Sequence, residues 1–329
     1  MAVLVLGGTG YIGSHTVYEL IEAGRDVVVA DNLLTGFRAA VHPKARFYQL
    51  DIRDRKALDV LFQAEKIDGV IHFAACSQVG ESMSDPLKYY NNNLYGTMVL
   101  LQAMVDHGVG AVVFSSSAAI YGEPERMPIL EDDPAAPTNC YGETKLAMER
   151  MMAWVSRAHG LHYVALRYFN ACGAHPSGRI GEAHNPETHL IPLILQVANG
   201  KRGHISIFGG DYPTADGTCI RDYIHVTDLS KAHVLALDYL LAGDGNNVFN
   251  LGNGVGFSVK EVIDVARKVT GHPIPAVLCG RRDGDPAQLV ASSEKIQSVL
   301  GWTPQQADLE AIIASAWAWH KNHPDGYCS

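Results

Sequence analysis

Short apolar segments of strand length alternate with longer segments of helix length through the first half of this 329-residue chain. Such strands can bury both of their faces only if helices pack on both sides of a single sheet. The pattern therefore predicts an α/β fold with a doubly wound parallel sheet. The expected strands are residues 3–6, 26–30, 47–50, 69–73, 111–115 and 162–167.

A glycine-rich turn joins the first expected strand to the first expected helix and contains Gly7, Gly10 and Gly13. Glycines at this spacing permit a tight turn, a close approach to a pyrophosphate and close packing of helix on strand. The first helical amides, at Tyr11 and Ile12, would then point to the phosphates. A purely structural turn is the alternative, but the position between strand and helix favours a dinucleotide cofactor.

Asp31 ends the second expected strand, 18 residues after Gly13. A carboxylate there would bind the adenosine ribose hydroxyls and repel a 2′-phosphate, so we expect NAD rather than NADP. The alternative is a solvated aspartate that begins a turn with Asn32. Further residues at the carboxyl edge of the sheet are predicted to line the cofactor site, although Phe73 could belong to the core. They are Asp51, Ile52, Phe73, Ala74 and Ala75.

Tyr141 and Lys145 lie four residues apart at the start of an expected helix, so their side chains project from one face. A nearby ammonium favours the ionised form of a tyrosine, which makes Tyr141 a candidate general base. A helical surface pair is the alternative. Ser115 and Ser117 end the fifth expected strand, where a serine hydroxyl could orient a reacting hydroxyl. The order of glycine turn, strand-end serine and Tyr/Lys helix favours a catalytic site.

The second half of the chain begins with a loop rich in Gly, Pro and His at residues 171–188, whose length indicates a functional role. Strand-like residues return at 221–226 and 248–251, and Ser258 with Glu261 predicts the capped start of a helix. We expect a cofactor-binding domain at residues 1–170, with returning segments near 221–252. A smaller, interleaved lobe at 171–329 would bind the substrate.

Composition narrows the class of partner and the place of action. The net charge of −9 argues against a broad electropositive face for nucleic acid or an anionic membrane. The chain opens directly with a strand-like run and contains no apolar run of about 20 residues, so neither a secretion signal nor a membrane span is expected. The scattered cysteines favour reduced thiols and a cytoplasmic location. They are Cys76, Cys140, Cys172, Cys219, Cys279 and Cys328.

The chain contains 15 histidines, among them His184, His189, His320 and His323. None of them has a recognised ligand spacing with carboxylates. We therefore expect no metal site.

Several longer motifs resemble those of the extended short-chain dehydrogenase/reductases, and among these the family of UDP-glucose 4-epimerases. The resemblance extends over nearly the whole length and implies a Rossmann fold with tightly bound NAD. The implied reaction is the reversible 4-epimerisation of UDP-glucose and UDP-galactose through a 4-keto intermediate. The motifs include GGTGYIGSH (7–15), VIHFAA (70–75), YGETK (141–145), RYFNACGAHPSG (167–178), RDYIHV (221–226) and FNLGNG (249–254).

The resemblance also implies roles for individual residues. Tyr141 would be the base, Lys145 would lower its pKa and hold the nicotinamide ribose, and Ser117 would orient the sugar 4-hydroxyl. The implied contacts to NAD are Gly7, Gly10, Tyr11, Ile12, Gly13, Asp31, Asn32, Asp51, Ile52, Phe73, Ala74, Ala75, Asn93, Ser115, Tyr141, Lys145 and Tyr168. The implied contacts to the UDP-sugar are Ser117, Asn170, His189, Leu190, Arg221, Arg282 and Asp285.

Three positions depart from the family pattern. Ser77 replaces a lysine of some epimerases near the cofactor, and His189 replaces an asparagine beside the substrate. Leu289 lies where some members have a bulky tyrosine that closes the sugar pocket. We hypothesise that the smaller leucine leaves room for an N-acetyl group.

Alternative functions remain open at this stage. A nucleotide-sugar 4,6-dehydratase would share the fold, but relatives place an Asp-Glu pair where this chain has Ala118 and Ala119. Epimerases and decarboxylases acting on UDP-glucuronate also remain possible. A redox-sensing binding protein would be expected to lack the Tyr/Lys pair. The expected helices at 86–107 and 141–158 resemble a pair that forms a dimer interface in relatives.

Overall fold

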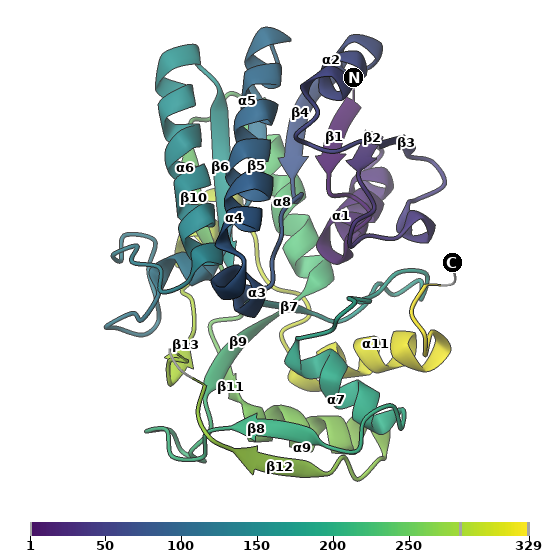
Figure 1. Cartoon of the computed structure of the whole chain (residues 1–329), viewed down its shortest axis with the longest axis vertical. Coiled ribbons are helices and arrows are strands. Elements are labelled where there is room, and N and C mark those ends of the chain that lie inside the picture. Colours follow the sequence, from purple (N-terminus) through teal and green to yellow (C-terminus); the bar gives the residue numbers. More distant parts are fainter. Residues whose placement is uncertain (1, 283–284, 328–329) are drawn as a thin grey trace.

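A parallel sheet of seven strands organises the upper part of the computed structural model, which describes residues 2–282 and 285–327 (Figure 1). The strand order is β10-β6-β5-β4-β1-β2-β3, and every neighbouring pair is parallel. The bounds are β1 Ala2–Leu6, β2 Asp26–Asp31, β3 Arg46–Gln49, β4 Ile67–His72, β5 Ala111–Ser115, β6 His162–Tyr168 and β10 Asn247–Leu251. The predicted doubly wound α/β fold is confirmed.

Successive residues of a strand point to opposite faces of the sheet, and in these strands the residues on both faces are apolar. Helices therefore cover both faces. Val3, Val5 and Val29 pack with α1 (Tyr11–Glu22) and α8 (Val226–Leu241) on one face. Leu4 and Leu6 pack on the other face with α2 (Arg55–Ala64), α5 (Gly96–Asp106) and α6 (Cys140–His159). Because both faces are buried, residues are free to serve a ligand only at the ends of the strands.

The long helix expected at 86–107 is divided into three parts. It begins with α4 (Pro86–Tyr89), passes through a π-helical turn at Tyr90–Tyr95 and continues as α5. A π-helical turn places one more residue in the helical turn and often lies at a functional site. Here it contains the fully buried Asn93.

The lower part contains two small sheets and its own apolar core. In one sheet, β9 (Ile220–His225) pairs with β7 (Asn170–Cys172), β11 (Gly256–Ser258) and β13 (Gln288–Leu289). In the other, β8 (Ile205–Phe208) pairs with β12 (Ala276–Cys279). The helices α7 (Leu190–Ala198), α9 (Val259–Thr270) and α11 (Leu309–Asn322) complete this part. Helix α9 begins at the predicted Ser258–Glu261 capping box.

The chain passes between the two parts more than once (Figure 1). After β9 in the lower part, α8 and β10 return to the large sheet. Helix α10 (Glu294–Leu300) then packs on β10 from the far end of the sequence. The strand expected at 221–226 is thus β9 of the small sheet. The segment that returns to the large sheet begins after it, with α8. The predicted division into domains at residue 170 stays a prediction.

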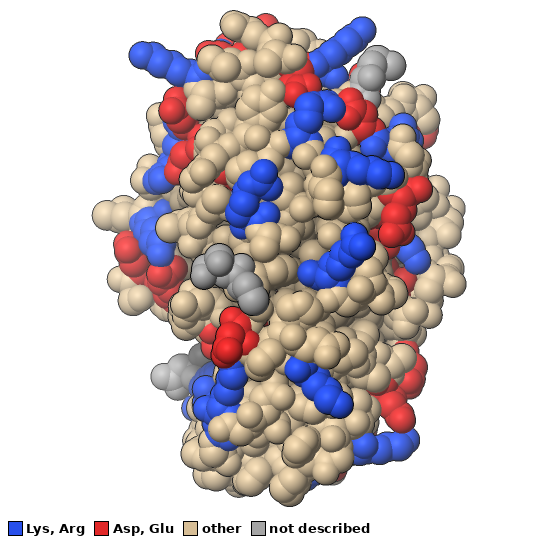
Figure 2. Space-filling view, turned by 90° about the vertical axis from the view of Figure 1, so that its right-hand side faces the viewer, with Lys and Arg blue, Asp and Glu red and all other residues tan. Residues whose placement is uncertain are grey.

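The surface shown in Figure 2 intersperses Lys and Arg with Asp and Glu between wide uncharged areas. Acidic and basic side chains of this kind pair locally, as Arg25 does with Asp238. A search of the described residues finds no helix with the length and apolarity that crossing a membrane requires.

Candidate active site

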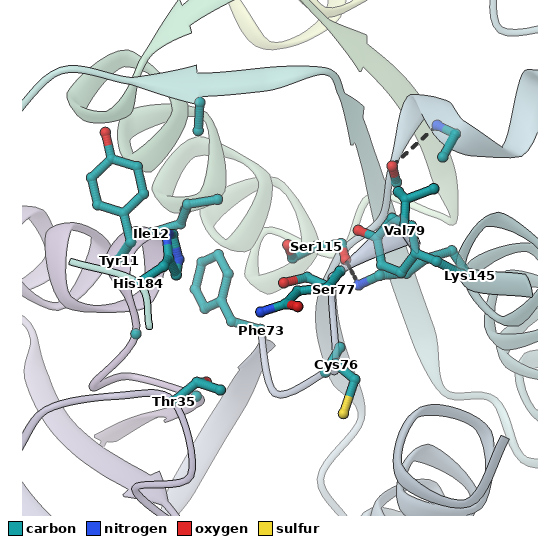
Figure 3. Close-up of a pocket in the computed structure, with 18 of the residues that line it drawn as sticks. Tyr11, Ile12, Thr35, Phe73, Cys76, Ser77, Val79, Ser115, Lys145 and His184 are labelled. Atoms are coloured by element: carbon teal, nitrogen blue, oxygen red, sulfur yellow. Dashed lines mark hydrogen bonds between the residues drawn. The ribbon is translucent and has the colours of Figure 1, made fainter. Parts of the chain in front are cut away.

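A cavity of about 800 Å³ lies at the carboxyl edge of the large sheet, between the sheet and the lower part. Parallel strands end at the same edge, so the residues that follow β1, β2, β4, β5 and β6 line one space. Figure 3 shows Tyr11, Ile12 and His184 together at one end of this space and Ser115 and Lys145 together at the other. The predicted dinucleotide site and the predicted catalytic site therefore line the same cavity.

The glycine turn is shaped by close backbone contact. Gly7 has a φ of +78°, which L side chains rarely adopt, and a Cβ added at Gly13 would lie 2.2 Å from the Gly7 carbonyl oxygen. Helix α1 begins at Gly10 without a side-chain cap, so its first amides are available to a ligand. Gly7, Gly10, Tyr11, Ile12 and Gly13 all line the cavity. The turn therefore suits a pyrophosphate.

Asp31 lies in the cavity wall with its carboxylate fixed by backbone amides. Its Oδ2 accepts a hydrogen bond of 3.0 Å from the Thr9 amide, and its Oδ1 accepts one of 2.8 Å from the Leu33 amide. Asn32 also lines the cavity and donates from Nδ2 to Asp51 Oδ2 at 3.2 Å. A fixed carboxylate beside the glycine turn is the hydrogen-bond acceptor expected for ribose hydroxyls.

Most of the other predicted cofactor contacts also line the cavity, and two lie behind it. The lining residues are Ile52, Phe73, Ala74, Ala75, Ser115 and Tyr168. Asp51 pairs with Arg53 outside the lining, and that guanidinium holds the pKa of the Asp51 carboxyl well below its usual range. Asn93 bonds the backbone of Cys76 in both directions, at 2.8 Å and 3.0 Å, while its neighbour Asn92 lines the cavity. Direct contact of Asp51 or Asn93 with a cofactor stays a prediction.

Tyr141, Lys145 and Ser117 all line the cavity, as expected from their positions at the start of α6 and after β5. Lys145 is 3% exposed, donates from Nζ to the Ser115 carbonyl oxygen at 2.7 Å and lies 5.7 Å from the centre of the Tyr141 ring. Burial lowers the pKa of Lys145 to about 7, against the opposing effect of Glu149. Burial also raises the pKa of Tyr141, with the Ser117 hydroxyl opposing the shift.

These pKa directions refine the expectation that Lys145 lowers the pKa of Tyr141. Burial is the largest cause of both shifts and disfavours the charged form of each group. Tyr141 is therefore protonated at neutral pH until further positive charge enters the cavity. The chemistry requires that a ligand or a substrate completes the electrostatics of the site.

The predicted substrate residues gather around the lower wall. Asn170, His189, Arg221 and Asp285 line the cavity, as do the two departures Ser77 and Leu289. Arg221 and Asp285 form an ion pair, with side chains 12% and 26% exposed. Leu190 begins α7 outside the lining, and the Arg282 guanidinium stacks 3.9 Å from the centre of the Phe208 ring. Contacts of Leu190 and Arg282 with a substrate stay predictions.

Comparison with known proteins decides the family. A model of the NAD-dependent epimerase/dehydratase family matches residues 3–252. UDP-glucose 4-epimerase from Lacticaseibacillus casei is 59% identical over 327 residues, 99% of each chain. The chain belongs to this family of NAD-dependent epimerases and dehydratases. The resemblance inferred from its motifs is confirmed, and with it the prediction of an NAD-dependent epimerase.

Solved structures of epimerases in this family have the same fold. A crystal structure of a UDP-glucose 4-epimerase superposes with a TM-score of 0.98 at 53% identity and covers 100% of both chains. The enzyme from Bifidobacterium longum, solved with NAD+ and UDP, gives a TM-score of 0.94 at 41% identity over 99% of this chain and 100% of that one.

One buried network behind the catalytic pair escaped the sequence analysis. Glu149, two helical turns after Tyr141, accepts hydrogen bonds from Arg167 at 3.1 Å and 2.6 Å and from the Ser116 hydroxyl. The Glu149 and Arg167 side chains are 7% and 9% exposed. The spacing of residues 141, 145 and 149 on one helix face was the available signal. The network fixes α6 against the ends of β5 and β6.

A second missed feature is a group of two histidines and two glutamates at the cavity wall, namely Glu182, His184, Glu187 and His189. The sequence analysis found no recognised ligand spacing between histidines and carboxylates, whereas the structure brings His184 and His189 beside Glu182. Burial opposes protonation of both rings, but the carboxylates outweigh it and raise the pKa to about 9 for His184 and about 10 for His189. The spacing E-x-H-x-x-E-x-H was the available signal.

We expect Glu149→Gln to lower the free energy of unfolding by about 3 kcal/mol or more, because it leaves the buried Arg167 charge without its partner. Urea denaturation would measure this. Asp238→Asn is the matched control, since it breaks the exposed Arg25 pair and should cost less than about 1 kcal/mol. If both variants lost the same free energy of unfolding, the buried Glu149–Arg167 pair would contribute no more to stability than the exposed pair, which would contradict this prediction.

The same variant has a second readout in the pH profile. Glu149 raises the pKa of Lys145, so its removal should lower that pKa further. If the protonated amine is needed, activity falls as pH rises through this pKa, and the alkaline limb of the Glu149→Gln profile moves to lower pH. An unchanged limb would show that Glu149 acts only on stability.

Proposed function

We propose that the protein interconverts UDP-glucose and UDP-galactose by reversible epimerisation at C4 of the sugar, with NAD bound throughout. One observation supports this most directly. Tyr141 and Lys145 line the same cavity as the glycine turn and Asp31. A proton-transfer group and a dinucleotide site therefore share one space, as an oxidation and reduction at a single sugar carbon requires.

The glycine turn, the α1 amides and Asp31 would hold the cofactor, with Lys145 and Tyr168 toward the nicotinamide half. Bound NAD supplies a hydride acceptor for C4 of the sugar, a hydride donor for the return step and, in its oxidised form, a positive charge. In the proposed mechanism Tyr141 removes the proton of the C4 hydroxyl once this charge favours its phenolate. Lys145, held by the Ser115 carbonyl, adds a second positive charge beside the ring.

Ser117 would donate to or accept from the C4 oxygen and so keep the reacting proton in line with Tyr141. On the far side, Asn170 and Arg221 would hold the diphosphate, and a guanidinium fork suits that geometry. Arg221 would exchange its Asp285 partner for phosphate oxygens, and Asp285 would be free for a ribose hydroxyl. The 4-keto sugar must turn over before the hydride returns, so the nucleotide has to anchor the substrate while the sugar stays loosely bound.

Dehydration is disfavoured by the wall of the cavity. A 4,6-dehydratase needs an acid and a base near C5 and C6, whereas the residues after the strand-end serine are Ala118 and Ala119. Both line the cavity and neither can transfer a proton. Epimerisation at C4 needs no acid beyond the Tyr141 hydroxyl.

We predict that Tyr141→Phe lowers the conversion of UDP-galactose to UDP-glucose about 10²- to 10⁴-fold, the contribution typical of general acid–base catalysis. The assay uses purified protein without added NAD, and bound NAD is quantified after denaturation. Tyr239→Phe is the control, because Tyr239 lies in α8, is partly buried against Phe249 of β10 and is outside the cavity lining. A Tyr141→Phe enzyme with full activity and full NAD content would disprove the assignment of the base.

We also propose that the enzyme accepts N-acetylated UDP-sugars, since Leu289 lies in the cavity wall where a tyrosine would occupy more space. Leu289→Tyr should reduce turnover of UDP-N-acetylglucosamine at least about 10-fold relative to UDP-glucose. Leu289→Met, of similar volume, should retain both activities. A wild-type enzyme that turns over UDP-glucose and not the N-acetyl form would refute this proposal.

We propose a homodimer from an exposed apolar surface on α3 (Val79–Ser84), α4, the π-helical turn, α5 and α6. Large apolar side chains on neighbouring helices are more often covered by a partner than left in water. They are Val79, Met83, Leu87, Tyr90, Tyr95, Met98 and Trp154.

Light scattering after size exclusion should give about twice the chain mass of 35.6 kDa. Met98→Glu should produce monomers, because it places a charge in the apolar surface. Val277→Glu on β12 is the matched control, since Val277 is 46% exposed and Met98 is 49% exposed. A wild-type protein that elutes as a monomer would overturn the proposal.

The remaining parts of the proposal concern location and domain roles. The cysteines in the described ranges are free thiols, which supports a reducing, cytoplasmic setting. Cys328 lies outside those ranges. We assign cofactor binding to residues 1–170 with the returning segment, and substrate binding to the lobe at 171–329.

A further inference from the structure

The two glutamates and two histidines at the cavity wall lie in the loop that joins β7 to α7, the last of them at the residue before α7 begins. One ligand atom from each of these four residues, Glu182, His184, Glu187 and His189, lies within 4.8 Å of the others. Glu182, His184 and His189 also line the cavity, and Figure 3 shows His184 next to Tyr11 and Ile12. The group is therefore part of the active-site wall and is distinct from the catalytic pair.

The distances within the group match a tetrahedral coordination site. With metal–ligand distances of about 2.0–2.1 Å, neighbouring ligand atoms of a tetrahedral zinc site lie about 3.3 Å apart. His184 Nδ1 lies 3.2 Å from Glu182 Oε1 and 3.5 Å from Glu187 Oε2. His189 Nδ1 lies 3.0 Å from Glu182 Oε1 and 2.9 Å from Glu187 Oε1. With one oxygen from each glutamate, three nitrogen–oxygen edges of the expected tetrahedron are present, and one ligand atom from each of the four residues lies within 4.8 Å of the others.

Burial and charge also favour a cation at this place. The Glu182 and Glu187 side chains are only 4% and 5% exposed, so two carboxylates share a nearly dry space. The buried His184 Nδ1 has no aligned hydrogen-bond partner, although two carboxylates lie near it. A cation at the centre would satisfy that nitrogen and both carboxylates at once.

Neighbouring contacts hold the group in position. Tyr327 bonds both the amide and the carbonyl of Gly181 at 3.1 Å, directly before Glu182. Glu187 Oε1 accepts from the amides of Thr188 and His189, each at 2.8 Å. The backbone before Glu182 and the Glu187 carboxylate are therefore held in place by contacts that do not depend on a metal, which lowers the cost of binding one.

We propose that Glu182, His184, Glu187 and His189 bind one divalent transition-metal ion, with Zn²⁺ as the best-suited species. Two imidazoles and two carboxylates are hard-to-borderline donors, and zinc accepts all four in tetrahedral geometry. The ion fixes residues 182–189 to the start of α7 and places a positive charge in the wall of the active-site cavity. The proposal does not rest on the proposed reaction, and its test measures metal binding instead of turnover, although His189 is also among the residues predicted to contact the substrate.

The test uses tag-free, NAD-containing enzyme that has been treated with a chelator and then titrated with Co²⁺ as a spectroscopic probe. We expect one Co²⁺ per chain, the intense visible absorption of a tetrahedral site, and its loss on adding Zn²⁺. Glu187→Gln and His184→Gln should each weaken binding at least about 10-fold. Glutamine at 187 retains an oxygen for the two backbone amides, so the fold is preserved.

Glu22→Gln is the matched control, because Glu22 belongs to a second group of glutamates and a histidine with Glu19 and His175. Binding that survives in Glu22→Gln and is lost in the other two variants supports the site. No binding at about 100 μM Co²⁺, or binding that the Glu187 and His184 variants retain, overturns it. If those variants fail to fold, anomalous X-ray scattering from wild-type crystals soaked in Zn²⁺ decides, and a peak away from the four side chains refutes the proposal.

Discussion

The ends of parallel strands meet at one edge of the sheet, and the active site depends on this constraint. Because helices bury both faces, the strands can offer residues to a ligand only where the chain leaves the sheet. The glycine turn after β1, Asp31 at the end of β2 and Ser115 at the end of β5 therefore line one cavity. The lower part closes that cavity by adding Arg221 and Leu289 from paired strands of its small sheet.

The buried charged side chains of this site are stabilised by hydrogen bonds and by ion pairs. Lys145 donates to a backbone carbonyl, and Glu149 binds both Arg167 and Ser116 behind it. Burial nevertheless lowers the pKa of Lys145 and raises that of Tyr141, so it disfavours the charged forms of both. Positive charge close to both groups would oppose this effect of burial on Tyr141.

Much of the fold and of the catalytic pair could be predicted because their signals are local. The alternation of strands and helices, the Gly7–Gly13 spacing and the four-residue spacing of Tyr141 and Lys145 are properties of short segments. The sequence was less informative about Asn93, whose amide binds the backbone of Cys76, and about Glu149. The spacing of Glu182, His184, Glu187 and His189 was visible in the sequence, but only the fold shows that these four side chains converge, because polar loop residues in water have a similar spacing.

By itself, the sequence determined which elements form, that they make a parallel doubly wound sheet, and which family of enzymes the chain resembles. Only the tertiary structure decided which side chains share a space, as with the Arg221–Asp285 pair and the four residues at 182–189. The physical reason is the separation in sequence of the residues that interact. Helix and strand periodicity arise between residues a few positions apart, whereas pKa shifts, ion pairs and ligand geometry depend on burial and on contacts between distant segments.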